Sequence, residues 1–131
     1  MTAPAPASEK TVLGWKLDPA QRAELLARFP PRYARAIADH VTLQSSIAPD
    51  APLPAAVAAE IVGRADDGEG VEAMVVRLDG TTDRPDGATF HITWSLRVGR
   101  EAKESNEVIA AHGWTLFERP IPLTLAPARW P

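Results

Sequence analysis

The chain has 131 residues, a formal net charge of −3 at pH 7 and no cysteine, and 45% of its residues are hydrophobic. This length and composition are typical of one soluble domain with a core of its own. The lack of cysteine excludes a disulfide framework, thiolate chemistry and a cysteine-ligated zinc site, and the acidic balance argues against an extended nucleic-acid surface, which is normally basic.

The N-terminal segment, residues 1–10, is rich in Ala and Pro and has no apolar periodicity. It predicts a disordered tail ahead of a single domain over 11–131. It has neither the charged start nor the apolar stretch of a secretory signal, and the sequence contains no apolar run of 18 residues. We therefore expect a cytoplasmic protein with no membrane partner.

The first elements have clear boundaries. Residues 11–17 predict a strand, and Asp18 followed by Pro19 is a strong signal for the start of a helix. That helix is expected to end at Pro30, because proline breaks a helix interior. A short second helix is predicted at 32–38.

The middle of the chain predicts mostly strands. A strand is expected at about 39–45, followed by a loop. Residues 55–60 are compatible with a helical turn, and 60–64 with a strand. The Asp- and Gly-rich residues 66–70 indicate a hairpin whose returning strand is 71–78.

The last third predicts a strand at about 88–96 and then a helix to about Ala111, capped by Ser105 or Asn106. A strand begins at Trp114, and the Pro-rich end is compatible with one more strand, at 121–125, before it unravels. The resulting order predicts an α+β fold with antiparallel sheet and helices on its outer faces.

One tetrapeptide pattern occurs twice, as His-Val-Thr-Leu at 40–43 and His-Ile-Thr-Trp at 91–94. In a strand, residues i and i+2 share one face and lie roughly 6–7 Å apart. Each strand would therefore present one imidazole and one hydroxyl to a common surface, while its apolar residues anchor the other face in a core. Two imidazoles and two hydroxyls suit in-line attack on a phosphate. The candidate residues are His40, Thr42, His91 and Thr93.

A single His-x-Thr has little value, because Thr favours strands and histidine is often structural. The duplication is the stronger signal, since it uses two of only three histidines. His112 precedes Gly113 at an expected helix end, where an imidazole interacts well with the helix dipole. No two histidines have the spacing that is typical of metal ligands, so we do not expect a metal ion.

Two further groups qualify as binding candidates. Residues 103–106, Lys-Glu-Ser-Asn, form a predicted helix start, and such a start is suited to anions; a basic cluster of Arg97, Arg100 and Lys103 overlaps it. Aromatic side chains are mostly core candidates, although one of them is available to stack on a base. The core candidates are Trp15, Trp94, Trp114 and Trp130, and the residue available for stacking is one of these or Tyr33 or Phe90.

The two motifs resemble those of the 2H phosphoesterase superfamily, which includes LigT-like RNA phosphodiesterases. The cyclic phosphodiesterase domain of fungal tRNA ligases is the most similar, on residues 39–43 (Asp-His-Val-Thr-Leu), 90–93 (Phe-His-Ile-Thr) and 103–106. The resemblance covers about 11–118, and only the motifs are specific. It implies a two-lobed, pseudo-twofold fold of antiparallel sheets with outer helices, and a central cleft between the motifs.

The resemblance also implies a hydrolase that uses no metal or other cofactor and opens 2′,3′-cyclic phosphates of nucleotides or RNA ends to 2′-phosphates. His91 would then act as base on water and His40 as acid on the leaving oxygen, although the sequence does not separate these roles. Thr42 and Thr93 would hold the non-bridging oxygens, and Lys103, Ser105 and Asn106 would bind substrate. The histidines are 51 residues apart (91 − 40), short for the superfamily, which favours a small nucleotide or an RNA terminus.

Two other classes of function stay open from the sequence. A non-catalytic module would use the same two-histidine cleft to bind a nucleotide or RNA end without turnover. In an interaction domain the His-x-Thr pairs would be purely structural.

Overall fold

The computed structural model describes residues 11–131, and the predicted tail at 1–10 lies outside the described residues. Its regular elements follow in chain order: β1 (Thr11–Leu17), α2 (Pro19–Arg28), β2 (Arg35–Ala36), β3 (His40–Ile47), β4 (Ala59–Asp66), β5 (Val71–Leu78), β6 (His91–Leu96), α3 (Glu104–His112), β7 (Thr115–Leu123) and β8 (Leu125–Trp130). Neither helix in this range has the length and apolarity that crossing a bilayer requires.

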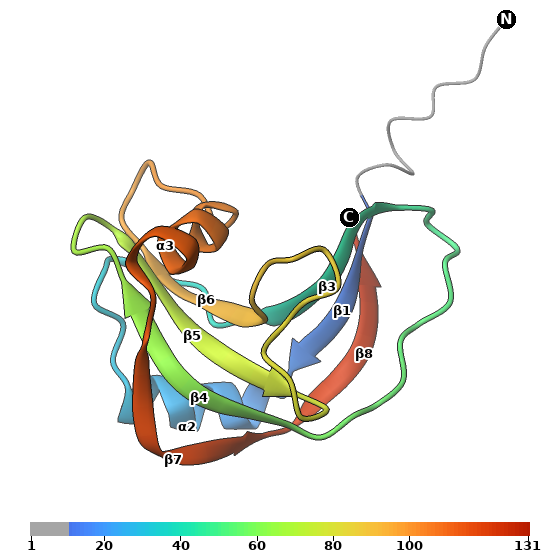
Figure 1. Ribbon diagram of the computed structural model, residues 1–131, viewed down its shortest axis with the longest axis horizontal. Coiled ribbons are helices and arrows are strands. Elements are labelled where there is room, and N and C mark those ends of the chain that lie inside the picture. The colour runs from blue at the N-terminus through green and yellow to red at the C-terminus, as the bar shows by residue number, and fades with distance from the viewer. Residues whose placement is uncertain (1–10) are drawn as a thin grey trace, which may run out of the picture.

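The strands form two antiparallel sheets, one in the order β3-β1-β8 and one in the order β2-β6-β5-β4-β7. β3 is an edge of the smaller sheet, and only the two-residue β2 lies outside β6 in the larger one. β3 and β6 are in contact where the sheets meet (Figure 1). The α+β class with antiparallel sheets is confirmed, and the two histidine strands are neighbours although distant in sequence.

The main core lies between the two sheets and α2, and its largest fully buried side chain is Trp94. Val41 and Ile92, from the two histidine motifs, are also fully buried there, and Leu43 packs against the same cluster. The apolar residues of both motifs therefore anchor their strands as predicted. Because strand side chains alternate, His and Thr at the intervening positions are directed away from this core.

The larger sheet is covered on both faces. Leu25 of α2 packs with one set of β4 and β5 side chains, and Ile109 of α3 packs with the alternate set, so that the helices lie on opposite sides of the sheet (Figure 1). Burial on both faces explains why β5 is an almost continuous apolar run. α3 is thereby fixed beside β5 and β6, next to the second motif.

β1 sets the register of the first motif, since Gly14 lies opposite Thr42 and Lys16 opposite His40. Gly14 permits the closest approach between these strands, because a Cβ there would lie 2.1 Å from the carbonyl oxygen of Val41. The chain thus needs glycine at the centre of β1 to hold β3 and its histidine in place.

Gly14→Ala is expected to destabilise the fold, because the methyl group would force β1 away from β3. Overpacking of this kind costs about 1–3 kcal/mol. Chemical denaturation followed by circular dichroism measures the change, with Ala126→Gly in the edge strand β8 as a comparison that removes a methyl group instead of adding one. An unchanged unfolding midpoint for Gly14→Ala would contradict the close approach.

The helix predicted at 32–38 is wrong, because the backbone there bonds to other elements. The amides of Ile37 and Ala38 donate to carbonyls of β6. Their own carbonyls accept bonds from the Arg22 guanidinium of α2. The segment therefore runs along β6 as the short strand β2 and leads directly into β3.

Two other boundaries differ from the sequence prediction. The helical turn considered at 55–60 does not form, and β4 begins at Ala59. The C-terminal end does not unravel after 125, since β8 pairs with β1 along its whole length. β8 is an edge strand, the position in a sheet where proline is tolerated.

Candidate functional site

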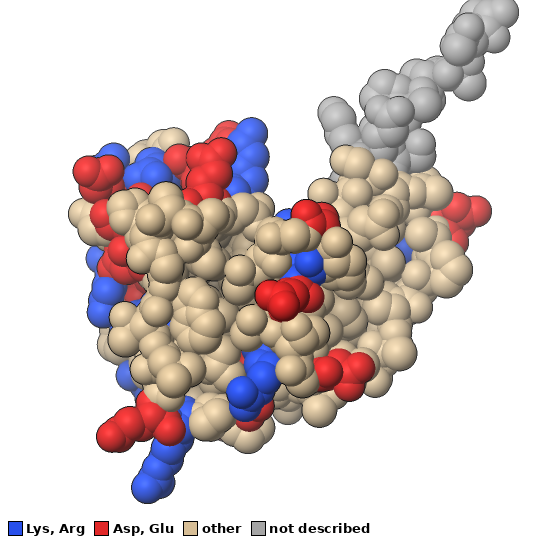
Figure 2. Space-filling view, viewed as in Figure 1, with Lys and Arg blue, Asp and Glu red and all other residues tan. Residues whose placement is uncertain are grey.

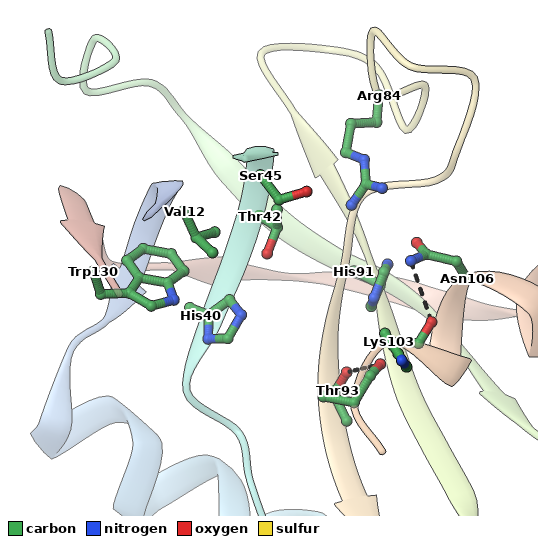
Figure 3. Close-up of a pocket in the computed structure, with 11 residues that line it drawn as sticks. Val12, His40, Thr42, Ser45, Arg84, His91, Thr93, Lys103, Asn106 and Trp130 are labelled. Carbon is green, nitrogen blue, oxygen red and sulfur yellow. Dashed lines mark hydrogen bonds between the residues drawn. The ribbon is translucent and has the colours of Figure 1, made fainter. Parts of the chain in front are cut away.

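A pocket of about 270 Å³ lies between β3 and β6 and is lined by all four motif residues, His40, Thr42, His91 and Thr93 (Figure 3). As predicted, the two motifs therefore lie at one pocket. The remaining lining residues come from several elements: Val12, Ser45, Arg84, Ala102, Lys103, Asn106 and Trp130.

His40 is held by a carboxylate. Its Nδ1–H donates to Asp39 Oδ2 at 2.9 Å, and the same oxygen accepts from Lys16 Nζ at 2.5 Å. Nε2 is thus the ring atom left for a ligand in the pocket. Burial lowers the pKa of His40 below its ordinary value, and the hydrogen bond and charge of Asp39 oppose that shift by favouring the protonated ring.

His91 is held by a backbone carbonyl instead. Its Nδ1–H donates to the carbonyl oxygen of Thr89 at 2.7 Å, which fixes the tautomer with Nε2 unprotonated. Burial lowers the pKa of His91, and the positive charges of Arg84 and His40 lower it further. The ring is 8% exposed, so a neutral imidazole with a basic Nε2 lines the pocket.

Asp39→Asn is expected to lower the pKa of His40 further, because it removes the one negative charge that favours the imidazolium and leaves Lys16 unneutralised nearby. Titration of the His40 ring protons by NMR measures this shift. A smaller change is expected at His91, because Asp39 is not among the causes of its pKa shift and acts on it only through His40. A His40 pKa that stays the same or rises would contradict the proposed influence of Asp39.

Thr93 and Ser105 act together. Ser105 is fully buried and does not line the pocket; its Oγ lies 2.9 Å from Thr93 Oγ1. Thr93 Oγ1 also lies 3.3 Å from the carbonyl oxygen of Ala102. When the Ser105 hydroxyl donates to Thr93 Oγ1, the Thr93 hydroxyl is free to rotate away from the Ala102 carbonyl. It then donates its own proton to a ligand in the pocket. Ser105, predicted as a substrate contact, is placed as a support for Thr93.

The start of α3 differs from the prediction. The helix begins at Glu104 after Lys103 with no side-chain cap, so the predicted capping by Ser105 or Asn106 is wrong. Lys103 and Asn106 do line the pocket. Within the described residues, Asn106 Oδ1 is the one buried side-chain oxygen or nitrogen without a hydrogen-bond partner.

The other basic residues of the predicted cluster lie elsewhere. Arg100 is paired with Asp67 and Glu104 outside the pocket, and Arg97 is not among the lining residues. His112 ends α3 and is also absent from the lining, in agreement with its structural interpretation.

Arg84 is a charged pocket residue that no sequence pattern indicated. It lies in the loop between β5 and β6, and Figure 3 shows its guanidinium directed toward the space between Thr42 and His91. Asp86 accepts from Arg84 Nε at 2.9 Å and from Nη2 at 2.8 Å, which fixes the guanidinium and leaves Nη1 for a ligand. The loop itself is closed by Arg84 N–H to the Ala88 carbonyl at 2.9 Å.

Trp130 reaches the pocket because β8 brings it opposite Val12 of β1. Its ring lies 4.5 Å from the His40 ring, centroid to centroid, and Lys16 Nζ lies 4.5 Å from its centroid. Trp15 and Trp94 are buried in the core as predicted, and Phe90, a candidate for stacking on a base, is buried there as well. Of the aromatic residues proposed for stacking on a base, Trp130 alone in the described chain lines this pocket.

The surface carries charges of both signs. Figure 2 shows acidic and basic side chains interspersed over the face in view, with the largest gathering around α3 and its flanking loops. Residues 11–131 contain no group of three or more His, Asp or Glu placed to hold a metal ion.

The chain matches no known family model, no curated protein and no solved structure. The resemblance to the 2H phosphoesterases therefore rests on the motifs alone, and the chemistry of this pocket has to carry the functional argument.

Proposed function

We propose that this protein is a metal-independent phosphodiesterase that opens the 2′,3′-cyclic phosphate of a nucleotide or an RNA end to a 2′-phosphate. One observation carries the proposal: two imidazoles on neighbouring strands, one from each sheet, line one pocket, and each has its Nδ1–H bonded away from it. Two Nε2 atoms are thus available to act on opposite sides of one phosphorus, as acid–base hydrolysis requires.

The surroundings of the two rings favour different roles. His91 is neutral, deeply buried and near a guanidinium, so its Nε2 is suited to take a proton from water. His40 is bonded to a carboxylate, so it is the ring better able to hold a proton when an anionic phosphate enters. As the water oxygen bonds to phosphorus, the bond to the 3′-oxygen breaks, and His40 donates its proton to that oxygen.

The remaining polar groups suit the phosphate oxygens. Thr42 and Thr93 supply neutral hydroxyl donors, one from each strand. Arg84 adds a fixed cation, and Lys103 adds one that is 82% exposed and paired with Glu101. Preorganised donors of this kind stabilise the charge that develops on the oxygens in the transition state.

The pocket volume and the mixed surface charge favour a small substrate over long RNA. Incubation of the protein with 2′,3′-cyclic AMP in EDTA, followed by phosphorus NMR, tests the proposal. We expect conversion to adenosine 2′-phosphate. Binding of the nucleotide without conversion would favour the non-catalytic module instead, and absence of both would indicate a structural role for the motifs.

A further inference from the structure

A second pocket, of about 460 Å³, adjoins the first. It is lined by Leu43, Gln44 and Ser45 of β3 and by Pro85 and Asp86 of the loop between β5 and β6. Ser45 lines both pockets, and Pro85 and Asp86 directly follow Arg84, which lines the first. The two pockets therefore share the same two walls and form one groove.

The charges of the two pockets differ in sign. The first has Arg84 and Lys103, whereas the second has one carboxylate and no basic residue in its lining. The fork of Arg84 holds the pKa of Asp86 at about 2, so this carboxylate is ionised at neutral pH. A phosphate is attracted to the first pocket and repelled from the second, which fixes the direction in which a nucleotide lies.

We propose, on the premise of the proposed function, that the second pocket takes the nucleobase and that Gln44 and Asp86 select bases presenting amino or imino donors. Leu43 and Pro85 supply apolar surface for the base faces. The ionised carboxylate is an acceptor only, whereas the Gln44 amide both donates and accepts. The pair therefore distinguishes bases by the donors on their edges.

The Asp86 carboxylate is positioned for this role. Oδ1 accepts from Arg84 Nε and from the Ala88 amide, and Oδ2 accepts from Arg84 Nη2. A carboxylate oxygen has room for about two hydrogen bonds, so Oδ2 has one acceptor position left. The side chain is 55% exposed, which leaves that position open to the pocket.

Guanine presents two adjacent donors, N1–H and the N2 amino group, one for the remaining position of Asp86 Oδ2 and one for the Gln44 amide oxygen. Adenine and cytosine present one exocyclic amino group. Uracil has its N3–H between two carbonyl oxygens, which the carboxylate repels. The expected order of preference is therefore guanine first, adenine and cytosine next, and uracil last.

The test is to measure kcat/KM for the four 2′,3′-cyclic nucleotides with wild type and with Asp86→Asn. We expect a guanosine-to-uridine ratio of about 10 or more for wild type. In Asp86→Asn the ratio is expected to fall toward 1, because the amide also donates to uracil carbonyls. Loosening of Arg84 affects all four substrates equally, since the phosphate is common to them, and it cancels in the ratio.

Asp83→Asn is the matched control, because Asp83 lies in the same loop but outside both linings, and its ratio should equal that of wild type. A wild-type ratio near 1, or one that Asp86→Asn leaves unchanged, would overturn the base subsite while the phosphodiesterase stands.

A binding measurement tests the subsite even without turnover. Guanosine 2′-phosphate is expected to shift the backbone amide signals of Leu43 and Gln44 in NMR titrations, with an affinity about tenfold above that of uridine 2′-phosphate. Absence of turnover with all four cyclic nucleotides would reject the proposed function, whereas equal affinities, or no shift at Leu43 and Gln44, would reject the base subsite.

Discussion

His40→Ala and His91→Ala are each expected to lower kcat for a 2′,3′-cyclic nucleotide by about 10²–10⁴-fold, the usual contribution of a positioned acid or base. Each variant removes one of the two Nε2 atoms that line the pocket, and neither ring belongs to the apolar core. The fold should persist, because Val41 and Ile92 beside them supply the core contacts of the two strands. Steady-state kinetics with circular dichroism measures both effects.

His112→Ala is the matched control, since His112 is the third histidine of the chain and lies at the end of α3 outside the pocket. It should retain wild-type turnover. If both motif variants kept wild-type kcat, the histidines would have no chemical role, and the binding and structural interpretations would be favoured.

Arg84→Ala is expected to lower kcat/KM by about 10²–10³-fold, as removal of one preorganised donor to a developing oxyanion typically does. The guanidinium is held by Asp86 and directed into the pocket, so its loss removes a fixed cation beside the phosphate. Arg84→Lys should recover part of the activity, because it keeps the charge but not the fork.

A second result distinguishes Arg84 from a structural residue. Its charge lowers the pKa of His91, so Arg84→Ala should raise that pKa, as measured by NMR titration of the ring. Arg77→Ala, which breaks a pair with Glu60 outside the pocket, is the control and should change neither quantity. Unchanged kinetics in Arg84→Ala would remove Arg84 from the site.

The limits of a helix or strand could be predicted where the residues of that element and its immediate neighbours determine them. The strands at 11–17 and 71–78 have the predicted limits, and Asp18 caps α2, accepting from the amide of Gln21 at 3.0 Å. The four motif residues also meet at one pocket. Alternation along a strand depends on local geometry alone, which is why His and Thr could be assigned to one face.

Features that depend on contacts with residues distant in the sequence could not be predicted. Residues 32–38 look helical by composition, yet Arg22 and the carbonyls of β6 take their backbone hydrogen bonds. Pro127 suggested an unravelled end, whereas an edge strand tolerates it and so delivers Trp130 to the pocket. Arg84 is brought to the site by its loop, and no sequence spacing indicates that position.

Hydrolysis of a cyclic phosphate by His40 and His91 would place one oxygen atom from water in the product. The most direct test is phosphorus NMR of 2′,3′-cyclic AMP incubated in H₂¹⁸O with EDTA, using wild type and His91→Ala. We expect wild type to form adenosine 2′-phosphate carrying one ¹⁸O, seen as an isotope shift, and His91→Ala to form essentially none. No conversion by wild type, or equal conversion by both proteins, would contradict it.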